Sequence, residues 1–306
     1  MPRSDSTRTL TELATEPGPQ VGLGLLGFPV SHSISPAMHN AALAMLARDE
    51  VRFGTWRYEK FSVAPGELAQ VLPVLHAKGF VGLNLTVPHK EAVLDHVEAV
   101  DEFVRAAGAA NTLVRTETGW RATNTDGGGL TDALKAEFNL SLAGRNVILL
   151  GAGGAARAAA AQCLRHAVAS LWIYNRSRDR LALLLNQLRP HAGAVPLHGF
   201  TGGNFPDDLP TGALVINATT LGLKKGDPSP LDLRRVPLPG HVYDMIYNPP
   251  ATPLLQQAAA LAIPRANGLS MLVHQGARSL ALWTGRPVPI ATMHRAAGEM
   301  LTIPVQ

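Results

Sequence analysis

Residues 147–157 read Val147-Ile148-Leu149-Leu150-Gly151-Ala152-Gly153-Gly154-Ala155-Ala156-Arg157, and this stretch determines the fold of the chain. Its first four residues form an unbroken apolar run, which is typical of a parallel strand covered on both faces. The glycines predict a tight turn, and the alanines that follow favour a helix. Gly151, Gly153 and Ala156 occupy the small positions of the pattern G-x-G-x-x-[GA], in which backbone N–H groups approach a pyrophosphate. The stretch therefore predicts a dinucleotide-binding strand–turn–helix unit.

A glycine-rich turn between a strand and a helix can also occur without a ligand, so the next strand decides between two interpretations. Residues 171–174 form that apolar strand. In NAD-binding proteins this strand ends in Asp or Glu, which binds the ribose 2′-hydroxyl. Here it is followed by Asn175-Arg176-Ser177-Arg178-Asp179-Arg180, with arginines in place of an acid at the strand end. Because arginine binds phosphate well, the segment predicts NADP as the cofactor; a solvated basic loop is the alternative.

Composition places the chain among globular proteins. Its 306 residues are 46% hydrophobic and 16% charged, which is enough for a substantial core and for two domains. The formal net charge is +4 and no block of like charges occurs, which argues against nucleic acid and favours a small anionic ligand.

No apolar run is long enough to span a membrane. The single cysteine, Cys163, excludes a disulfide framework, and we expect a cytoplasmic location.

Two further features bear on what the chain does not contain. Residues 1–20 carry Ser, Thr, Pro and acidic residues without an apolar core, so we expect a disordered arm rather than a signal peptide. The 11 histidines include no pair with metal-ligand spacing, so we expect no metal site.

A second candidate site follows the short, glycine-bearing strand predicted over 21–27. Ser33 and Ser35 precede Pro36, which suits the first position of a helix that runs to about residue 47. Two hydroxyl groups at a helix N-terminus could bind a carboxylate. On spacing alone the structural interpretation is favoured, in which Ser35 is the N-cap and Ser33 belongs to a turn, because N-cap serines are common.

A lysine follows the next strong strand, predicted over 80–86. Pro88 suits the first helical position, which puts Lys90 in the first turn of a helix, where a cation opposes the macrodipole. A residue placed against local electrostatics is a candidate for function. An exposed lysine that tolerates a small penalty is an equally good interpretation.

Residues 111–115 and 119–123 alternate around a turn and predict a β-hairpin. Asp126 and three glycines follow, before a helix over 130–138. Asp126 can be an N-cap, or a carboxylate at a hinge that faces a cleft between domains. Later strands over 213–217 and from residue 241, and a helix from Ser270 that carries Gln275, complete an α/β pattern.

Taken together, these stretches resemble the shikimate dehydrogenase family over most of the chain, from about residue 21 to residue 275. The family pattern appears in the expected order, as Gly27-x-Pro29-Val30-x-His32-Ser33-x-Ser35-Pro36, Asn84-x-Thr86-x-Pro88-x-Lys90, Gly108-Ala109-Ala110-Asn111-Thr112, Asn124-Thr125-Asp126, Gly151-Ala152-Gly153-Gly154-Ala155, Asn175-Arg176-Ser177, Asp244-x-x-Tyr247-x-Pro249 and Gln275. One departure is Ser177, where threonine is frequent in the family; serine keeps the hydroxyl.

The resemblance implies an NADP-dependent oxidoreductase that reversibly reduces 3-dehydroshikimate to shikimate, in the biosynthesis of chorismate and the aromatic amino acids. Family members include monomers and homodimers. One alternative is a quinate or dual quinate/shikimate dehydrogenase, which differs in the pocket; the paired serines favour shikimate. Another, from a different class, is a catalytically inactive NADP-sensing regulator, which would have no reason to keep both Lys90 and Asp126.

The resemblance also implies the role of each site residue, with Lys90 and Asp126 as the acid–base pair. The implied substrate-binding residues are Ser33, Ser35, Thr86, Lys90, Asn111, Asp126, Tyr247 and Gln275, of which Ser33, Ser35 and Tyr247 hold the carboxylate. The implied cofactor-binding residues are Gly151, Ala152, Gly153, Gly154, Ala155, Asn175, Arg176, Ser177, Arg180, Thr219, Met245 and Gly268. Among these, Arg176 and Arg180 contact the 2′-phosphate.

The expected fold is therefore α/β with two domains. An N-terminal α/β substrate-binding domain covers 21–125 and is completed by C-terminal helices over 269–306. A Rossmann-type NADP-binding domain with a parallel sheet covers 126–268.

Overall fold

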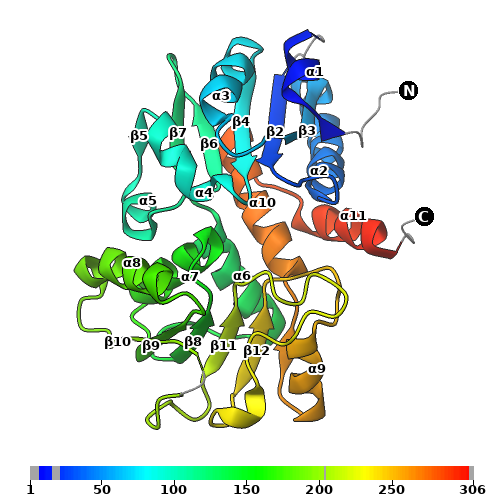
Figure 1. Ribbon diagram of the computed structural model, residues 1–306. Coiled ribbons are helices and arrows are strands. Elements are labelled where there is room, and N and C mark those ends of the chain that lie inside the picture. Colours follow the sequence, from blue (N-terminus) through cyan, green and yellow to red (C-terminus); the bar gives the residue numbers. More distant parts are fainter. Residues whose placement is uncertain (1–6, 16–20, 203–204, 303–306) are drawn as a thin grey trace. The chain divides into compact units, whose positions relative to one another are not determined.

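The computed structural model describes residues 7–15, 21–202 and 205–302, which form two compact units (Figure 1). Of the described residues, those up to Thr125 and those from Leu272 onward form unit one, and Asp126–Met271 form unit two. The sequence predicts the first domain boundary after residue 125. The second lies three residues after the predicted residue 268, because helix α10 (Leu269–Thr284) continues across it. The α/β fold class is confirmed.

Unit one is built on a sheet with the strand order β1-β3-β2-β4-β6-β7-β5. Neighbours among β1, β3, β2 and β4 are parallel, whereas β6 is antiparallel to β4 and β7, which confirms the predicted hairpin. The strands are β1 (Thr7–Arg8), β2 (Val21–Gly27), β3 (Trp56–Ser62), β4 (Phe80–Leu85), β5 (Ala99–Val100), β6 (Thr112–Arg115) and β7 (Trp120–Thr123).

The helices of unit one come from both ends of the chain. They are α1 (Leu10–Thr15), α2 (Ser35–Asp49), α3 (Leu68–Ala77), α4 (His89–Ala92), α5 (Glu102–Ala107), most of α10 and α11 (Ile290–Thr302), with 3₁₀ helices at Val51–Thr55 and Val93–His96. Helix α3 buries Leu68, Val71, Leu72 and Leu75 at helical spacing. These side chains share one core cluster with Phe80, Leu83 and Leu85 of β4, so α3 is held on the sheet by apolar burial.

Unit two contains a fully parallel sheet with the strand order β10-β9-β8-β11-β12-β13. The strands are β8 (Asn146–Leu150), β9 (Ser170–Tyr174), β10 (Leu197–Phe200), β11 (Leu214–Asn217), β12 (His241–Asp244) and β13 (Arg265–Ala266). The helices are α6 (Asp126–Phe138), α7 (Gly154–Arg165), α8 (Arg178–Leu188) and α9 (Pro253–Ala260), with 3₁₀ helices at Arg189–His191 and Leu233–Arg235. This is the order of a Rossmann fold, as predicted.

The strands of unit two end at one level. Leu150 of β8 pairs with Tyr174 of β9 and with Asn217 of β11, and Asn217 pairs with Asp244 of β12. The strand order reverses beside β8, and the carboxyl ends at such a point line the ligand crevice of an open α/β sheet. This edge of unit two is therefore where a cofactor is expected.

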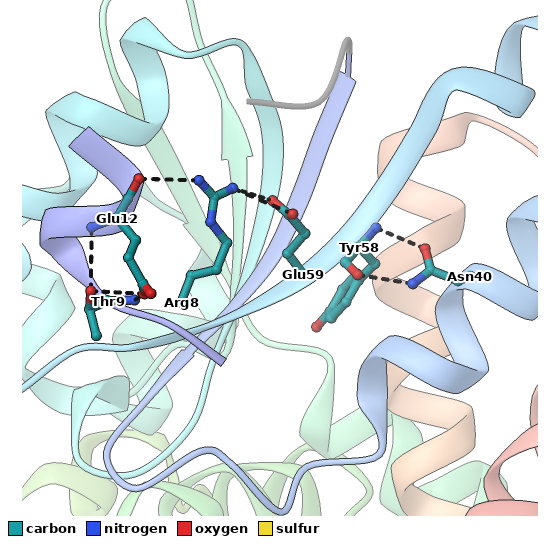
Figure 2. Close-up of polar contacts among 6 residues, drawn as sticks. All are labelled: Arg8, Thr9, Glu12, Asn40, Tyr58 and Glu59. Carbon is teal, nitrogen blue, oxygen red and sulfur yellow. Dashed lines mark hydrogen bonds and ion pairs between the residues drawn. The ribbon is translucent and has the colours of Figure 1, made fainter. Parts of the chain in front are cut away.

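The expectation of a disordered arm over residues 1–20 is wrong for residues 7–15, which form β1 and α1 (Figure 2). The Arg8 guanidinium lies 3.2 Å from a carboxylate oxygen of Glu59 on β3. Thr9 and Glu12 form a reciprocal capping box, in which each backbone N–H donates to the other side chain, at 2.8 and 3.3 Å. The spacing T-x-x-E is visible in the sequence and could have predicted α1. Residues 1–6 and 16–20 lie outside the described residues.

Four helices start at other residues than predicted. Helix α10 begins at Leu269, one residue before the predicted Ser270. Helix α2 begins at Ser35, after Ile34, so Ser35 is not an N-cap. Helix α4 begins at His89, one residue after Pro88, although Lys90 still lies in the first turn. Helix α6 begins at Asp126, so the glycines at 127–129 are helical instead of forming a loop before residue 130. Helix ends depend on one or two backbone dihedral angles, which residue preferences specify weakly.

Two features of the described residues bear on function. Among the helices that they form, none combines the length and the apolar character needed to cross a membrane. Their His, Cys, Asp and Glu side chains nowhere gather into a group of three or more that could hold a metal ion.

Candidate active site

The glycine turn of unit two has a shape that only glycine allows at its first position. Gly151 has φ +115°, which L-residues rarely adopt, and its N–H donates to the carbonyl oxygen of Tyr174 at 2.8 Å. A Cβ at this position would lie 3.1 Å from the carbonyl oxygen of Ala218. The turn is thus fixed between the ends of β9 and β11. Ala152 is buried within it.

Gly153 is a different case, because nothing in the protein requires a glycine there. Its φ is −87°, it occupies the N-cap position of α7, and a Cβ added to it would meet no atom within 4 Å. No side chain caps the helix N-terminus at this position. Gly154 and Ala155 are the first residues of α7, so their backbone N–H groups belong to the unsatisfied first turn. A small N-cap with open N–H groups fits a bound phosphate.

The segment after β9 presents three arginines. Ser177 is the N-cap of α8 and its Oγ accepts from the N–H of Arg180 at 3.3 Å, while the Asn175 amide donates to the Ser177 carbonyl at 2.8 Å. These bonds hold the backbone, and the side chains of Arg176, Arg178 and Arg180 are exposed. Exposure fits both a 2′-phosphate site and a solvated basic loop.

Three further candidates lie after β11, after β12 and before α10. Thr219 donates through its N–H and its hydroxyl to Oδ1 of Asn217, at 3.0 and 2.8 Å. The Met245 N–H donates to the Asn217 carbonyl at 2.9 Å. A side chain at Gly268 would collide with the carbonyl group of Met245. All predicted cofactor residues therefore lie at the carboxyl edge of β8, β9, β11 and β12 or pack against it.

The first group of candidates in unit one is the serine pair between β2 and α2. The hydroxyl of Ser33 lies 3.2 Å from that of Ser35 and accepts from the Ser35 N–H at 3.3 Å. The Ser33 N–H donates to the Val30 carbonyl at 3.0 Å, closing a turn. Because Ser35 lies in the helix and caps no N–H, the favoured structural interpretation of its hydroxyl is wrong.

The second group lies at the end of β4 and the start of β6. The Thr86 N–H donates to the Leu26 carbonyl at 2.9 Å, which places Thr86 beside the end of β2. Half-buried Lys90 accepts at its carbonyl from the N–H of Ala110 at 2.8 Å, so its backbone lies next to Asn111. Asn111 is 2% exposed, and its Nδ2 donates to Oε1 of Gln275 on α10 at 3.2 Å.

The remaining substrate candidates belong to unit two. Asp126 is 4% exposed and opens α6. It directly follows Thr125, whose N–H donates to Oδ1 of Asn111 at 2.7 Å within unit one. Tyr247 is half-buried in the segment after β12. Ser33, Ser35, Thr86, Lys90, Asn111 and Gln275 lie in unit one, where β2, β4 and β6 are neighbours in the sheet.

The structure also shows polar residues to which the sequence assigned no role. Asn84, at 4% exposure in the otherwise apolar strand β4, donates to Ser279 of α10 at 2.9 Å. Oδ1 of Asn84 accepts from the hydroxyl of Tyr58, which lies on β3 and is 1% exposed. An asparagine inside a buried apolar run is unusual, and this signal could have marked Asn84.

Comparison with known proteins connects these two units to one family. The model described as "Shikimate dehydrogenase substrate binding domain" matches residues 25–113, and that described as "Shikimate 5'-dehydrogenase C-terminal domain" matches residues 268–297. The shikimate dehydrogenase (NADP(+)) of Citrifermentans bemidjiense is 38% identical over 283 residues, which cover 92% of this chain and 96% of that protein. The chain belongs to the shikimate dehydrogenase family.

Solved structures agree with the family and share its fold. The shikimate 5-dehydrogenase of Thermus thermophilus, in complex with NADP(H) and shikimate, is 34% identical with a TM-score of 0.78, and the match covers 92% of this chain and 100% of that one. The 5-ketofructose reductase of Gluconobacter sp. strain CHM43 is 32% identical with the same TM-score, over 92% and 98%. The second structure shows that the fold of this family also occurs in an enzyme named for another substrate, so specificity depends on individual residues.

Proposed function

We propose that the protein is an NADP-dependent oxidoreductase that reversibly reduces 3-dehydroshikimate to shikimate, a step of the shikimate pathway in the cytoplasm. The observation that carries the proposal is the similarity to NADP(+)-dependent shikimate dehydrogenases over 92% of the chain. The open N-cap at Gly153 and the exposed arginines after β9 support a phosphorylated dinucleotide. A quinate dehydrogenase is disfavoured by the same comparison.

We propose that unit two holds NADP through the glycine turn, Asn175–Arg180, Thr219, Met245 and Gly268. Bound NADPH supplies the hydride. Ser33, Ser35 and Tyr247 hold the substrate carboxylate, and Thr86, Asn111 and Gln275 hold the ring hydroxyls. As the ketone is reduced, the ammonium of Lys90 stabilises the negative charge that develops on the oxygen and donates a proton to it. Asp126 orients Lys90 for this transfer.

Initial rates measured for shikimate and for quinate, each with NADP and with NAD, test the proposed function. We expect the highest kcat/KM for the pair of shikimate and NADP. A higher kcat/KM with quinate would contradict the substrate assignment, and the absence of any dinucleotide reduction would favour an inactive regulator.

Replacing Arg176 with alanine should raise the KM for NADP at least tenfold and leave the KM for NAD nearly unchanged. A charge-assisted hydrogen bond to phosphate contributes about 1.5–3 kcal/mol to binding. NAD has no 2′-phosphate, so its binding does not depend on this bond. Arg178→Ala is the matched control, since Arg178 is exposed in the same segment and is not assigned a contact. If neither variant changes the KM for NADP, the segment is a solvated basic loop.

Replacing Ser33 or Ser35 with alanine should raise the KM for shikimate about tenfold without changing that for NADP, because each hydroxyl loses a bond to the carboxylate. The Tm of Ser35→Ala should stay close to that of the wild type, since Ser35 caps no helix N–H and its bond from the half-buried Ser33 hydroxyl is long, at 3.2 Å. Ser31→Ala, in the same loop and exposed, is the control. A lower Tm with an unchanged KM would assign the serines a structural role only.

A further inference from the structure

One chain of hydrogen bonds runs through the interior of unit one to the side chains of Asn111 and Gln275. The Tyr58 hydroxyl donates to Oδ1 of Asn84 at 2.8 Å. Nδ2 of Asn84 donates to Oγ1 of Thr112 at 3.1 Å, and Thr112 donates to Oδ1 of Asn111 at 2.9 Å. Nδ2 of Asn111 donates to Oε1 of Gln275 at 3.2 Å. We call these five residues the amide relay.

Every bond of the amide relay points the same way, from Tyr58 toward Gln275. A phenol hydroxyl has one hydrogen, and an amide donates only through nitrogen and accepts only through oxygen. Once Tyr58 donates to the oxygen of Asn84, the nitrogen of Asn84 must face Thr112. The Thr112 hydroxyl donates to the oxygen of Asn111, the nitrogen of Asn111 donates to the oxygen of Gln275, and Nε2 of Gln275 donates to the Leu272 carbonyl at 2.7 Å.

Backbone groups agree with these orientations at two points. Nδ2 of Asn84 also donates to the carbonyl oxygen of Asn111 at 3.1 Å, and a carbonyl can only accept. Oδ1 of Asn111 accepts from the N–H of Thr125 at 2.7 Å, and an N–H can only donate. These two backbone bonds support the orientations of Asn84 and Asn111 in the relay. The Thr112 hydroxyl also lies within bonding distance of the hydroxyls of Thr125 and Ser279, at 3.2 and 2.8 Å.

Tyr58, at the head of the relay, is held through both its ring and its backbone. Its ring stacks on that of His39 at 4.0 Å between centroids. Its backbone N–H donates to Oδ1 of Asn40 and its carbonyl accepts from Nδ2, at 2.9 and 3.0 Å (Figure 2). Burial raises the pKa of Tyr58 well above its usual value, so the hydroxyl keeps its proton.

We propose that Tyr58, Asn84 and Thr112 are positioning residues, which determine which atoms of Asn111 and Gln275 are presented to the substrate hydroxyls. The inference rests on the proposed function, because it needs Asn111 and Gln275 to bind substrate. A buried amide whose oxygen loses its donor carries an unsatisfied polar group, so the amide rotates or inverts. Asn111 is then held by fewer bonds, because its oxygen keeps those from Thr125 while the bond from Thr112 is weakened or lost.

The test compares Tyr58→Phe and Thr112→Val with Thr284→Val. The first two break the relay at its head and in its middle. Thr284 is a matched control on α10, 5% exposed, whose hydroxyl donates to the Leu280 carbonyl at 2.7 Å and has no partner in the relay. Each substitution removes one buried hydroxyl, so all three should lower the Tm of the protein.

We expect the KM for shikimate to rise about tenfold in Tyr58→Phe and in Thr112→Val, with the KM for NADP unchanged. Thr284→Val should keep the wild-type KM for both. A wild-type KM for shikimate in either relay variant that folds would overturn the proposal, because the bonds would then serve stability alone. Failure of the proposed function is recognised separately, since the wild-type protein itself would then show no shikimate-dependent reduction of NADP.

Discussion

Replacing Lys90 with alanine is expected to lower kcat about 10²- to 10⁴-fold, with a modest change in the KM for shikimate. The ammonium acts on charge that develops only as the ketone oxygen is reduced, so its loss affects the transition state more than substrate binding. Lys90→Arg keeps the positive charge but donates a proton poorly, and should recover only part of the lost rate. Initial rates under saturating NADP and shikimate measure the effect.

Asp126→Asn should lower kcat in the same way, since we propose that both residues act on one proton. The double variant should therefore be little slower than the slower single variant. Lys78→Ala, which removes a half-buried lysine at the end of α3, is the control for general effects of charge removal. A wild-type kcat in Lys90→Ala would refute the proposed mechanism. If the two single losses in kcat multiply in the double variant, the two residues act separately.

The free energy of unfolding is expected to fall by up to about 3 kcal/mol as the pH is lowered from about 6.5 to about 4, through His39 alone. Burial lowers the pKa of His39 from 6.5 to about 4, against the opposing effect of the bond to the Ser35 carbonyl. Between these pH values the unfolded chain binds a proton at His39 and the folded chain does not. The contribution is therefore complete above pH 6.5 and is lost progressively toward pH 4.

Denaturant unfolding measures this effect when the wild type and His39→Gln are compared at several pH values in this window. The comparison separates the contribution of His39 to the free energy of unfolding from that of the carboxylates. The variant should lose less stability on acidification than the wild type, because glutamine does not titrate. His198→Gln is the comparison variant, since the ring of His198 also stacks on an aromatic side chain, Trp172, but is only half-buried. Equal acid sensitivity in the wild type and His39→Gln would refute the prediction.

Features that depend on neighbouring residues could be predicted from the sequence. The strand, turn and helix around Gly151 can be predicted because an apolar run, closely spaced glycines and a run of helix formers lie within 20 residues. The parallel sheet of unit two follows from repetition of that pattern. The glycines at 127–129 suggest a hinge before the nucleotide-binding domain, although these residues are helical.

Features that depend on distant residues could not be predicted from the sequence. The bond between Asn84 and Ser279 joins positions 195 residues apart, and no local period or spacing records it. Helix α2 begins at Ser35 because of one set of backbone angles, and this shift of a single residue changes Ser35 from a cap into a helical residue with a hydroxyl that caps nothing. Electrostatics alone does not decide whether Lys90 is a functional residue or an exposed lysine that tolerates a small penalty. Only the family pattern favours a functional role for Lys90.

The two-segment composition of unit one affects the order in which the protein can be made. Unit two is one continuous segment, Asp126–Met271, so all its strands are synthesised before α10 is complete. Unit one begins earlier but must wait for α10, which supplies Gln275 and Ser279. Until then Asn84 and Asn111 lack these partners and can bond to water in their place. In the growing chain, the part of unit one up to Thr125 therefore lacks its bonds to α10 until the C-terminal segment has been synthesised.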